Sequence, residues 1–251
     1  MLVWIRSCLY WLGLAVITPL FFTLGLLAFP LPAMQRHRVI TLWTPVMMWW
    51  LRLTCGLRYK VIGAENIPTT PSIIACKHQS GWETMALQLI FPQQVWVLKR
   101  ELLWIPFFGW GLAMTSPIAI DRGDRVRAAQ RLIDQGRERL KTGFWIVIFP
   151  EGTRIPPGQR GKYKQGAARL ARDLETPMVP VALNAGEFWP RNSFRKYPGE
   201  ITVVVGKPIV PAGQTPDQMT KELENWIEAR QSEISGVGPC AKATPQTKPS
   251  H

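Results

Sequence analysis

The sequence predicts an α/β fold, in which a mostly parallel sheet is flanked by helices and a hydrophobic helical membrane anchor precedes the sheet. After residue 52, short apolar segments alternate with segments of helical periodicity, a pattern typical of parallel strands joined by helices. Before that point, an uncharged stretch has the length that a bilayer core requires. We therefore divide the chain into an anchor of one or two helices (1–52), an α/β domain (53–235) and a disordered tail (236–251).

The N-terminal segment is the predicted anchor. No Asp, Glu, Lys or Arg occurs from Ser7 to Gln35, and Leu9 to Phe29 is a nearly continuous apolar run. That run is longer than the apolar part of a typical signal peptide, and a second apolar segment follows from Val39 to Leu51. Because Pro19 and Pro30 interrupt a straight helix, two arrangements stay open: a helix that spans the bilayer, or a hairpin of helices within one leaflet.

Seven short segments are predicted strands. Each is apolar and bounded by turn residues. Their apolar character on both faces indicates a sheet that is covered by helices on both sides. The predicted strands span 57–62, 72–76, 95–98, 118–120, 144–149, 178–183 and 201–205.

Four segments are predicted helices. Apolar residues recur at helical spacing from Val126 to Leu140, and Gly143 follows as the expected C-cap. The last helix begins at Thr215, because Pro216 and Gln218 occupy the first-turn and capping-box positions. The other helices span 82–90 and 164–174, and the last helix is expected to bury Met219, Leu223, Trp226, Ile227 and Ile234.

The net charge and the cysteine content indicate which partners and which cellular compartment suit the protein. The formal net charge of +13 favours an anionic partner, which can be nucleic acid, anionic lipid or a phosphorylated substrate. The four cysteines, Cys8, Cys55, Cys76 and Cys240, are widely scattered without a C-x-x-C pair. They predict neither a disulfide framework nor a zinc site, and a reduced, cytosolic environment fits best.

The clearest candidate for chemistry is the pair His78 and Glu83. On one continuous helix their side chains would point about 140° apart and could not cooperate. If His78 instead lies in the turn before a helix that Ser80 caps, Glu83 in the first turn can orient the imidazole as a general base. The alternative is purely structural, because Ser80-Gly81-Trp82-Glu83 is also a capping box.

Three polar clusters follow predicted strands: His78, Asp121-Arg122 and Glu151-Gly152-Thr153-Arg154. The carboxyl ends of parallel strands share one edge of a sheet, so these clusters are expected to converge on one crevice. Glycine permits close approach to an anion, Thr adds a hydroxyl donor, and Arg forms a bidentate pair with phosphate. An ordinary turn with solvated charges is the alternative for each cluster, and for Lys99 at another strand end.

Several catalytic motifs are absent from the sequence. It contains no G-x-S-x-G elbow, no phosphate-binding G-x-x-x-x-G-K-[ST] loop and no dinucleotide fingerprint. Cys76 lies on an apolar strand, which indicates a core residue. Direct attack by a substrate hydroxyl is therefore favoured over a covalent intermediate.

These segments together resemble the glycerolipid acyltransferase family over roughly residues 60–210. In that family the acid of the His-x-x-x-x-Asp motif is Asp, whereas this chain has Glu83, which still supplies a carboxylate. Four blocks occur in the expected order, and a segment from Lys99 to Gly109 is similar to the family's connecting segment. The blocks are His78 to Glu83, Ile118 to Arg122, Phe149 to Arg154, and Val179 to Asn184.

The resemblance implies a role for each matched residue. His78 would be the general base and Glu83 its orienting partner, within a fold of the glycerol-3-phosphate acyltransferase type. The residues implied to bind the glycerol phosphate are Arg122, Glu151, Gly152, Thr153 and Arg154, with Lys99 as a further contributor.

The resemblance also implies substrates and location. The acceptor would be lysophosphatidate, acylated at its sn-2 hydroxyl to phosphatidate, and the donor an acyl thioester of coenzyme A or acyl carrier protein. No metal, cofactor or nucleic acid would take part. The enzyme would sit on membrane lipid, at the bacterial inner membrane with its active site facing the cytoplasm.

Two rival functions stay open. A sibling acyltransferase would use another acceptor, either glycerol-3-phosphate or a lyso-ornithine lipid. A non-catalytic module would bind membrane or nucleic acid through its positive charge, and it would tolerate loss of His78 while weakening with salt.

Overall fold

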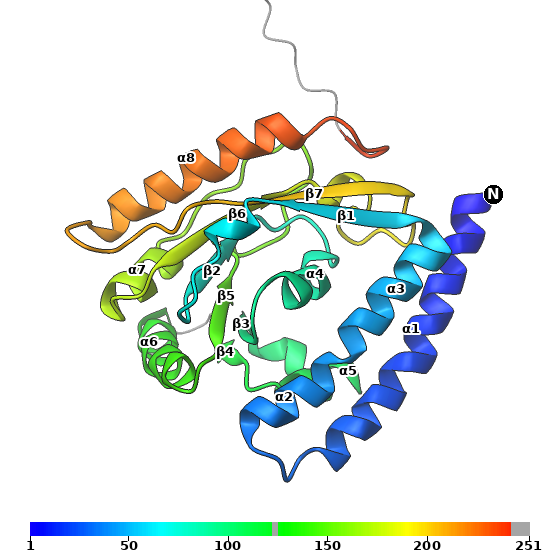
Figure 1. Cartoon of the computed structure of the whole chain (residues 1–251), viewed down its shortest axis with the longest axis horizontal. Coiled ribbons are helices and arrows are strands. Elements are labelled where there is room, and N and C mark those ends of the chain that lie inside the picture. Colours follow the sequence, from blue (N-terminus) through cyan, green and yellow to red (C-terminus); the bar gives the residue numbers. More distant parts are fainter. Residues whose placement is uncertain (122–124, 242–251) are drawn as a thin grey trace, which may run out of the picture.

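The computed structural model of the chain describes residues 1–121 and 125–241. Within this part, seven strands form one sheet: β1 (Leu57–Ile62), β2 (Ile73–Cys76), β3 (Gln94–Lys99), β4 (Ile118–Ile120), β5 (Trp145–Ile148), β6 (Met178–Leu183) and β7 (Gly199–Val205). Their order in the sheet is β1-β7-β6-β2-β5-β3-β4 (Figure 1). Only the neighbours β6 and β7 are antiparallel among these, so β1 and β7 run opposite to the other five strands. The prediction of a mostly parallel sheet is confirmed.

Helices cover both faces of the sheet, as predicted (Figure 1). In β2, Ile74 and Cys76 join one apolar cluster, whereas Ile73 and Ala75 join a second cluster on the other side. This alternation explains why the strands are apolar on both faces. The first cluster is covered by α3 (Trp43–Cys55) and α4 (Glu83–Ile90), and the second by α6 (Arg125–Lys141), α7 (Gly166–Asp173) and α8 (Pro216–Ile234).

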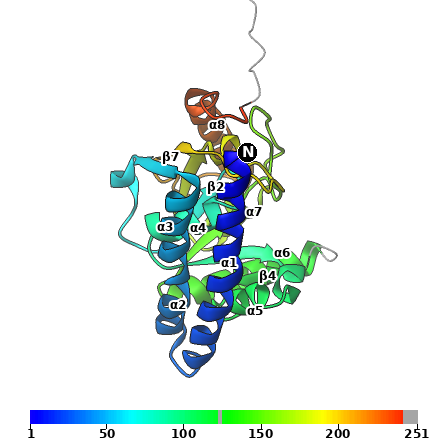
Figure 2. The same cartoon turned by 90° about the vertical axis from the view of Figure 1, so that its right-hand side faces the viewer.

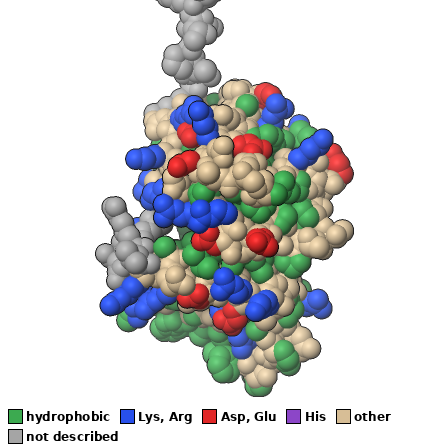
Figure 3. Space-filling model, turned by 90° about the vertical axis from the view of Figure 1, so that its left-hand side faces the viewer, with side chains coloured by type: hydrophobic (Ala, Val, Ile, Leu, Met, Phe, Trp, Pro, Cys, Tyr) green, Lys and Arg blue, Asp and Glu red, His purple; other side chains and the backbone are tan. Residues whose placement is uncertain are grey.

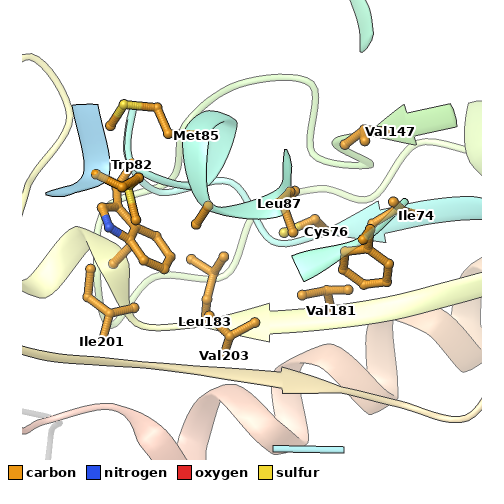
Figure 4. Close-up of a cluster of buried hydrophobic side chains, with 14 of the residues drawn as sticks. Ile74, Cys76, Trp82, Met85, Leu87, Val147, Val181, Leu183, Ile201 and Val203 are labelled. Carbon is orange, nitrogen blue, oxygen red and sulfur yellow. The ribbon is translucent and has the colours of Figure 1, made fainter. Parts of the chain in front are cut away.

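The first cluster holds α4 against the strand ends. Figure 4 shows Trp82 and Leu87 of the α4 segment on the side that faces Val181 and Leu183 of β6, and Met85 on the opposite side of that helix. All five side chains are buried. Since full burial of one large apolar side chain contributes about 1.5–3 kcal/mol, this contact fixes the turn that joins β2 to α4.

Two helices, α1 (Leu2–Leu27) and α2 (Ala33–Thr41), precede α3. Figure 2 shows α1 and α3 side by side on the face turned to the viewer, which is the right-hand edge of Figure 1. Trp50 Nε1 donates a hydrogen bond to Leu9 O at 3.1 Å. The Trp50 ring lies over Gly13, where a Cβ atom would come within 2.0 Å of Nε1, so the close contact requires glycine.

The second apolar segment of the predicted anchor belongs to the core of the α/β domain. Met47, Leu51 and Cys55 of α3 are buried in the first apolar cluster. The predicted boundary at residue 52 is therefore wrong, because α3 continues to Cys55 and its inner face packs on the α/β domain. A run of apolar residues does not reveal whether lipid or protein covers it.

The outer face of α1 differs from its inner face. Leu12, Val16 and Leu20 recur at helical spacing and are largely exposed. Among the described helices, α1 is long and apolar enough to cross a membrane, and only 17% of its most apolar stretch is buried. The opposite side of the molecule, shown in Figure 3, carries many Lys and Arg side chains with Asp and Glu between them. The molecule thus has one apolar side and one charged side.

The N-terminal half of α1 is attached to the loop that precedes β7. Lys196 N–H donates to Ser7 Oγ at 3.0 Å, and Trp11 Nε1 donates to Phe194 O at 3.1 Å. Trp4 stacks on the Phe194 ring with centroids 5.2 Å apart. These contacts join residues nearly 200 positions apart in sequence, with a separation of 189 for Lys196 and Ser7.

The predicted helix ends agree with the structure at two positions. Gln218 N–H donates to Thr215 Oγ1 at 3.2 Å, and Thr215 N–H donates to Gln218 Oε1 at 2.8 Å, which completes the capping box. Gly143 follows α6 with φ of +88°, as expected for its C-cap. The expected burial on α8 is confirmed for Met219, Leu223 and Ile227, whereas Trp226 and Ile234 are only partly buried.

The predicted disordered tail is wrong for its first six residues, 236–241. The Glu187 carboxylate accepts hydrogen bonds from the N–H groups of Gly236, Val237 and Gly238 at 2.6 to 3.1 Å. These contacts bind the chain end to the 3-10 helix η3 (Ala185–Glu187). Residues 242–251 lie outside the described residues.

Candidate active site

The carboxyl ends of β2 and β5 meet at one edge of the sheet. The two strands are adjacent and parallel, with Ala75 paired with Ile148, so His78 and Glu151 emerge side by side. Ile155 N–H donates to His78 O at 2.8 Å and connects the two segments that follow the strands. The expected convergence of these two polar clusters is confirmed.

His78 and Glu83 are in contact. His78 lies in the turn before α4, Glu83 is the first residue of that helix, and His78 Nδ1 lies 2.8 Å from Glu83 Oε1. A carboxylate only accepts hydrogen bonds, so Nδ1 carries the proton and Nε2 presents a lone pair. The imidazole side chain keeps 14% of its surface exposed, while the carboxylate is fully buried. This geometry is that of a general base with its orienting acid.

Glu83 also organises the turn. Its Oε1 atom accepts hydrogen bonds from Gln79 N–H and Ser80 N–H, both at 2.7 Å. Ser80 is not the N-cap that the sequence predicts, because α4 begins at Glu83 and Ser80 Oγ accepts from Trp82 N–H at 3.1 Å. The capping box is therefore half formed, and the carboxylate serves both the turn and the imidazole.

An aromatic stack fixes the plane of the His78 ring. The Phe149 ring lies parallel to it, with centroids 3.8 Å apart and an interplanar angle of 13°. Phe149 in turn stacks on Trp96 of β3 at 5.9 Å. With Nδ1 held by Glu83, the direction of Nε2 is set by two independent contacts.

Glu151 has a different position from the one that the sequence predicts. Its side chain is fully buried; Oε1 lies 2.7 Å from Lys77 Nζ, and Oε2 accepts from His78 N–H at 3.0 Å. Burial raises the pKa of the Glu151 carboxyl, and the Lys77 ammonium opposes that rise. Both oxygens are thus engaged inside the protein, which contradicts the prediction that Glu151 binds the glycerol phosphate. Glu151 supports the main chain of His78 instead.

The three residues after Glu151 form a turn that leads to Arg154. Gly152 adopts a φ of +67°, a left-handed conformation that favours glycine. Arg154 Nη2 lies 3.7 Å from where a Cβ of Gly81 would be, so the guanidinium borders the turn between His78 and Glu83. Thr153 is exposed beside it. His78 and Arg154 therefore share one end of the sheet, as the predicted site requires.

The other two predicted substrate contacts are further along the sheet. Lys99 is exposed at the end of β3, on the far side of β5 from β2. Arg122, which follows the edge strand β4, lies outside the described residues. The roles of Lys99 and Arg122 stay predictions.

The structure adds residues that the sequence analysis missed. Lys77 Nζ lies 2.7 Å from Glu228 Oε1 as well as 2.7 Å from Glu151 Oε1, and Tyr163 donates to the same Glu228 oxygen at 2.8 Å. Lys77 could have been identified from the sequence, because it is an ionisable residue at the end of an apolar strand. No local signal identifies Glu228, because it is one of several charged residues on α8.

A histidine held by a buried carboxylate in this way is typical of one class of protein: enzymes in which an imidazole activates a hydroxyl group of the substrate. Cys76, the thiol nearest in sequence to His78, is buried in the core, and burial raises its pKa. It is therefore a core residue, as predicted, and not a nucleophile.

The chain belongs to the acyltransferase family, whose model, described as Acyltransferase, matches residues 58–184. It is 44% identical to the 1-acyl-sn-glycerol-3-phosphate acyltransferase of Pseudomonas aeruginosa, over 93% of each chain. The human 1-acyl-sn-glycerol-3-phosphate acyltransferase alpha is 28% identical, over 78% of this chain and 71% of that protein. The crystal structure of the LPA acyltransferase PlsC from Thermotoga maritima has the same fold, with a TM-score of 0.76, 21% identity, and coverage of 91% of this chain and 94% of that chain.

Proposed function

We propose that the protein transfers an acyl chain to the sn-2 hydroxyl of 1-acyl-sn-glycerol-3-phosphate (lysophosphatidate), giving phosphatidate. The observation that carries the proposal is the 2.8 Å contact between His78 Nδ1 and Glu83 Oε1 at the open end of the sheet. The 44% identity to the Pseudomonas aeruginosa enzyme supports the acceptor. The donor is an acyl thioester of coenzyme A or acyl carrier protein, and we expect no resident metal or cofactor.

The reaction needs one proton acceptor. His78 Nε2 takes the proton of the sn-2 hydroxyl while that oxygen attacks the thioester carbonyl carbon. The C–S bond then breaks, and the imidazolium returns the proton to the leaving thiolate. Glu83 stabilises the imidazolium between these steps. General-base help of this kind contributes about 10²–10⁴-fold, so positioning of both substrates supplies much of the remaining acceleration.

Arg154 is the best candidate to bind the phosphate of the acceptor. Its Nε is buried and has no hydrogen-bond partner among the described protein groups. A buried donor of this kind normally has a partner, and a guanidinium matches phosphate in bidentate geometry. Gly152 N–H donates to Phe149 O at 3.0 Å. We therefore expect Gly152 to contribute to the site through the shape of its turn and not through its N–H group. The Thr153 hydroxyl, Lys99 and Arg122 complete the proposed site.

We further propose that the protein lies in one leaflet of the membrane. Near its start, α1 contacts Phe194 through Trp4, and near its end Phe22 packs on Phe107 with ring centroids 5.6 Å apart. At 1.5 Å per residue these contacts lie about 27 Å apart along the helix, close to the roughly 30 Å of a bilayer core. If α1 crossed the bilayer, it would draw both contacting segments into the hydrocarbon.

The exposed apolar side chains favour the same orientation. Helix α1 contacts α5 (Phe108–Ala113), which packs on η2 (Arg100–Trp104), and Trp104, Phe108 and Trp110 of these two short helices are exposed. Tryptophans of this kind are typical of a membrane interface. The bilayer is expected to be the bacterial inner membrane, with the active site on its cytoplasmic side, where acyl thioesters are made.

An assay of purified protein tests the proposed reaction. Wild type and His78→Ala are compared with lysophosphatidate, glycerol-3-phosphate and a lyso-ornithine lipid as acceptors, each with acyl-coenzyme A and acyl carrier protein donors. We expect wild type to form phosphatidate, and His78→Ala to lose about 10²–10⁴-fold in rate while binding vesicles as before. Full activity of His78→Ala would overturn the mechanism. A preference for another acceptor would overturn the assigned substrate.

The acid is tested separately. Glu83→Ala removes the partner of Nδ1 and two main-chain hydrogen bonds, so we expect a large fall in kcat. Glu83→Asp retains a carboxylate one methylene shorter, and a small shift of the turn can restore the contact to His78. The loss in Glu83→Asp should therefore be much smaller, and equal losses would show that the carboxylate is not what matters.

A further inference from the structure

We propose that Lys77 and Glu228 are positioning residues of the active site: Glu228 on α8 holds the Lys77 ammonium against Glu151, and Glu151 holds the main chain of His78. The role rests on the proposed function, since it concerns the histidine assigned as the base. It makes the C-terminal helix α8 part of the catalytic centre. None of these three side chains is required to touch substrate.

The alternation of β2 explains why Lys77 points to α8. Cys76 lies in the apolar cluster under α4, so the next residue along the strand points to the opposite face, toward α7 and α8. The pairing with β6 continues to this residue, because Lys77 N–H donates to Val181 O at 2.9 Å. The Lys77 side chain is consequently fully buried between the sheet and α8. The next residue, His78, lies in the turn before α4, where its ring contacts Glu83 and Phe149.

The buried ammonium of Lys77 and the carboxylates of Glu151 and Glu228 stabilise one another. Lys77 Nζ lies 2.7 Å from Glu151 Oε1 and 2.7 Å from Glu228 Oε1, and the Glu228 side chain is only 17% exposed. Tyr163 adds a hydroxyl donor to the same Glu228 oxygen at 2.8 Å. A buried ammonium needs such partners, and removing one leaves an uncompensated charge in a low-dielectric site. The positions of Lys77 and Glu151 are therefore coupled to that of α8.

The last step of the network reaches the base. Glu151 Oε2 accepts from His78 N–H at 3.0 Å, and it is the second oxygen of the carboxylate that Lys77 holds. A shift of Lys77 lets Glu151 turn, and the His78 main chain loses its acceptor. The imidazole then leaves its position between Glu83 and the Phe149 ring. We expect such a change to lower kcat more than it raises the KM for the acceptor, because Glu151 contacts the His78 main chain directly, whereas Arg154 lies three residues further along the chain.

The full-length enzyme in detergent provides the test. Glu228→Ala removes both the charge and the acceptor, whereas Glu228→Gln keeps an oxygen that accepts from Lys77 and Tyr163. The matched control is Glu224→Gln, one helical turn earlier on α8, which breaks an exposed ion pair with Arg160 at 2.8 Å. We expect kcat to fall about tenfold to a hundredfold in Glu228→Ala, by less in Glu228→Gln, and not at all in Glu224→Gln, and the KM for lysophosphatidate to change less than kcat.

A second readout does not depend on turnover. The chain contains three histidines, so the imidazole signals can be followed by NMR after ¹³C labelling, and His78→Ala assigns the signal of interest. We expect the His78 signal to move in Glu228→Ala and Glu228→Gln and to stay in place in Glu224→Gln. A folded Glu228→Ala enzyme with wild-type kcat and an unmoved His78 signal would overturn the proposal. If wild type does not acylate lysophosphatidate, the proposed function fails, while a moved signal still supports the positioning role.

Discussion

Two fully buried lysines, Lys77 and Lys196, lie in contrasting regions of the molecule. Lys77 is at the catalytic end of the sheet, with one carboxylate oxygen on either side at 2.7 Å. Lys196 lies where α1 meets the loop before β7, and its Nζ donates to Phe194 O at 2.9 Å. That ammonium is otherwise surrounded by aromatic rings, with Nζ to centroid distances of 4.0 Å for Trp11, 4.4 Å for Trp189, 4.9 Å for Tyr10 and 5.8 Å for Phe194.

The contrast shows two ways to bury a cation. Around Lys77, opposite charges compensate for lost hydration, and the hydrogen bonds fix each oxygen in place. Around Lys196, the negative faces of the rings attract the ammonium but specify its position less closely. Burial lowers the pKa of Lys196 to about 8. Opposite charges thus surround the lysine next to His78, whereas aromatic rings surround the lysine beside the apolar helix α1.

The largest expected effect is that of Lys77→Met. The substitution leaves Glu151 and Glu228 buried without their cation, so we expect the free energy of unfolding to fall by about 3–5 kcal/mol. Denaturant unfolding in detergent measures it. The control is Arg160→Gln, which removes an exposed partner of Glu224 and should have little effect. Wild-type stability of Lys77→Met would mean that the two regions do not differ as described.

Lys196→Met should cost less. Methionine fills most of the space among the rings, and its sulfur also packs well on aromatic faces, so we expect a loss of about 1–2 kcal/mol. The backbone contact from Lys196 N–H to Ser7 is retained. Lys196→Arg, which keeps the cation, is the matched control and should be closer to wild type. A fall in the free energy of unfolding as large as that of Lys77→Met would show that aromatic rings and carboxylates do not differ in this way.

The pH dependence of stability gives a smaller and more specific test. The pKa of Lys196 is about 8 in the folded protein, below the ordinary lysine value of about 10.4 in the unfolded chain. Between these values the unfolded state binds more protons, so this group makes stability rise with pH in that window. The Tm difference between wild type and Lys196→Met should therefore shift in favour of wild type from pH 8 to 10. A constant difference would contradict the lowered pKa.

The smallest effect on folding, and a selective effect on membrane binding, is expected for the double variant Trp104→Ser, Phe108→Ser. Both side chains are exposed, one in η2 and one in α5, so their loss should leave Tm unchanged. If this aromatic region contacts lipid, partitioning into anionic vesicles should weaken by about tenfold. Vesicle flotation measures it, with Val210→Ser, an exposed apolar residue after β7, as control. Equal flotation of both variants would restrict the lipid contact to α1 and α3.

The structure agrees with the sequence where the signals are local. The strands β2, β5 and β6 are short apolar runs between turns, and the start of α8 depends on the side chains of Thr215 and Gln218, three residues apart. The contact of His78 with Glu83 is similarly local, because five residues of turn are enough to bring the two side chains together. Such features need only the chain's own periodicity and caps.

The residues that the sequence analysis placed wrongly or missed are those whose partners are distant in sequence. Glu151 stands in a motif that suits phosphate, but it pairs with Lys77, 74 residues away. Glu228 meets the same lysine across 151 residues. The inner face of α3 and the Glu187 contact with residues 236–238 likewise depend on what packs against them.

The amino-acid order was sufficient for the strands, for the helices α4, α6, α7 and α8, and for the contact of His78 with Glu83, because each depends on spacing within a few residues. Which charged groups bind substrate and which support the backbone was decided only by the tertiary structure. A carboxylate binds substrate or supports the backbone according to its burial and to the cation beside it, and both are set by the packing of β2, β5 and α8.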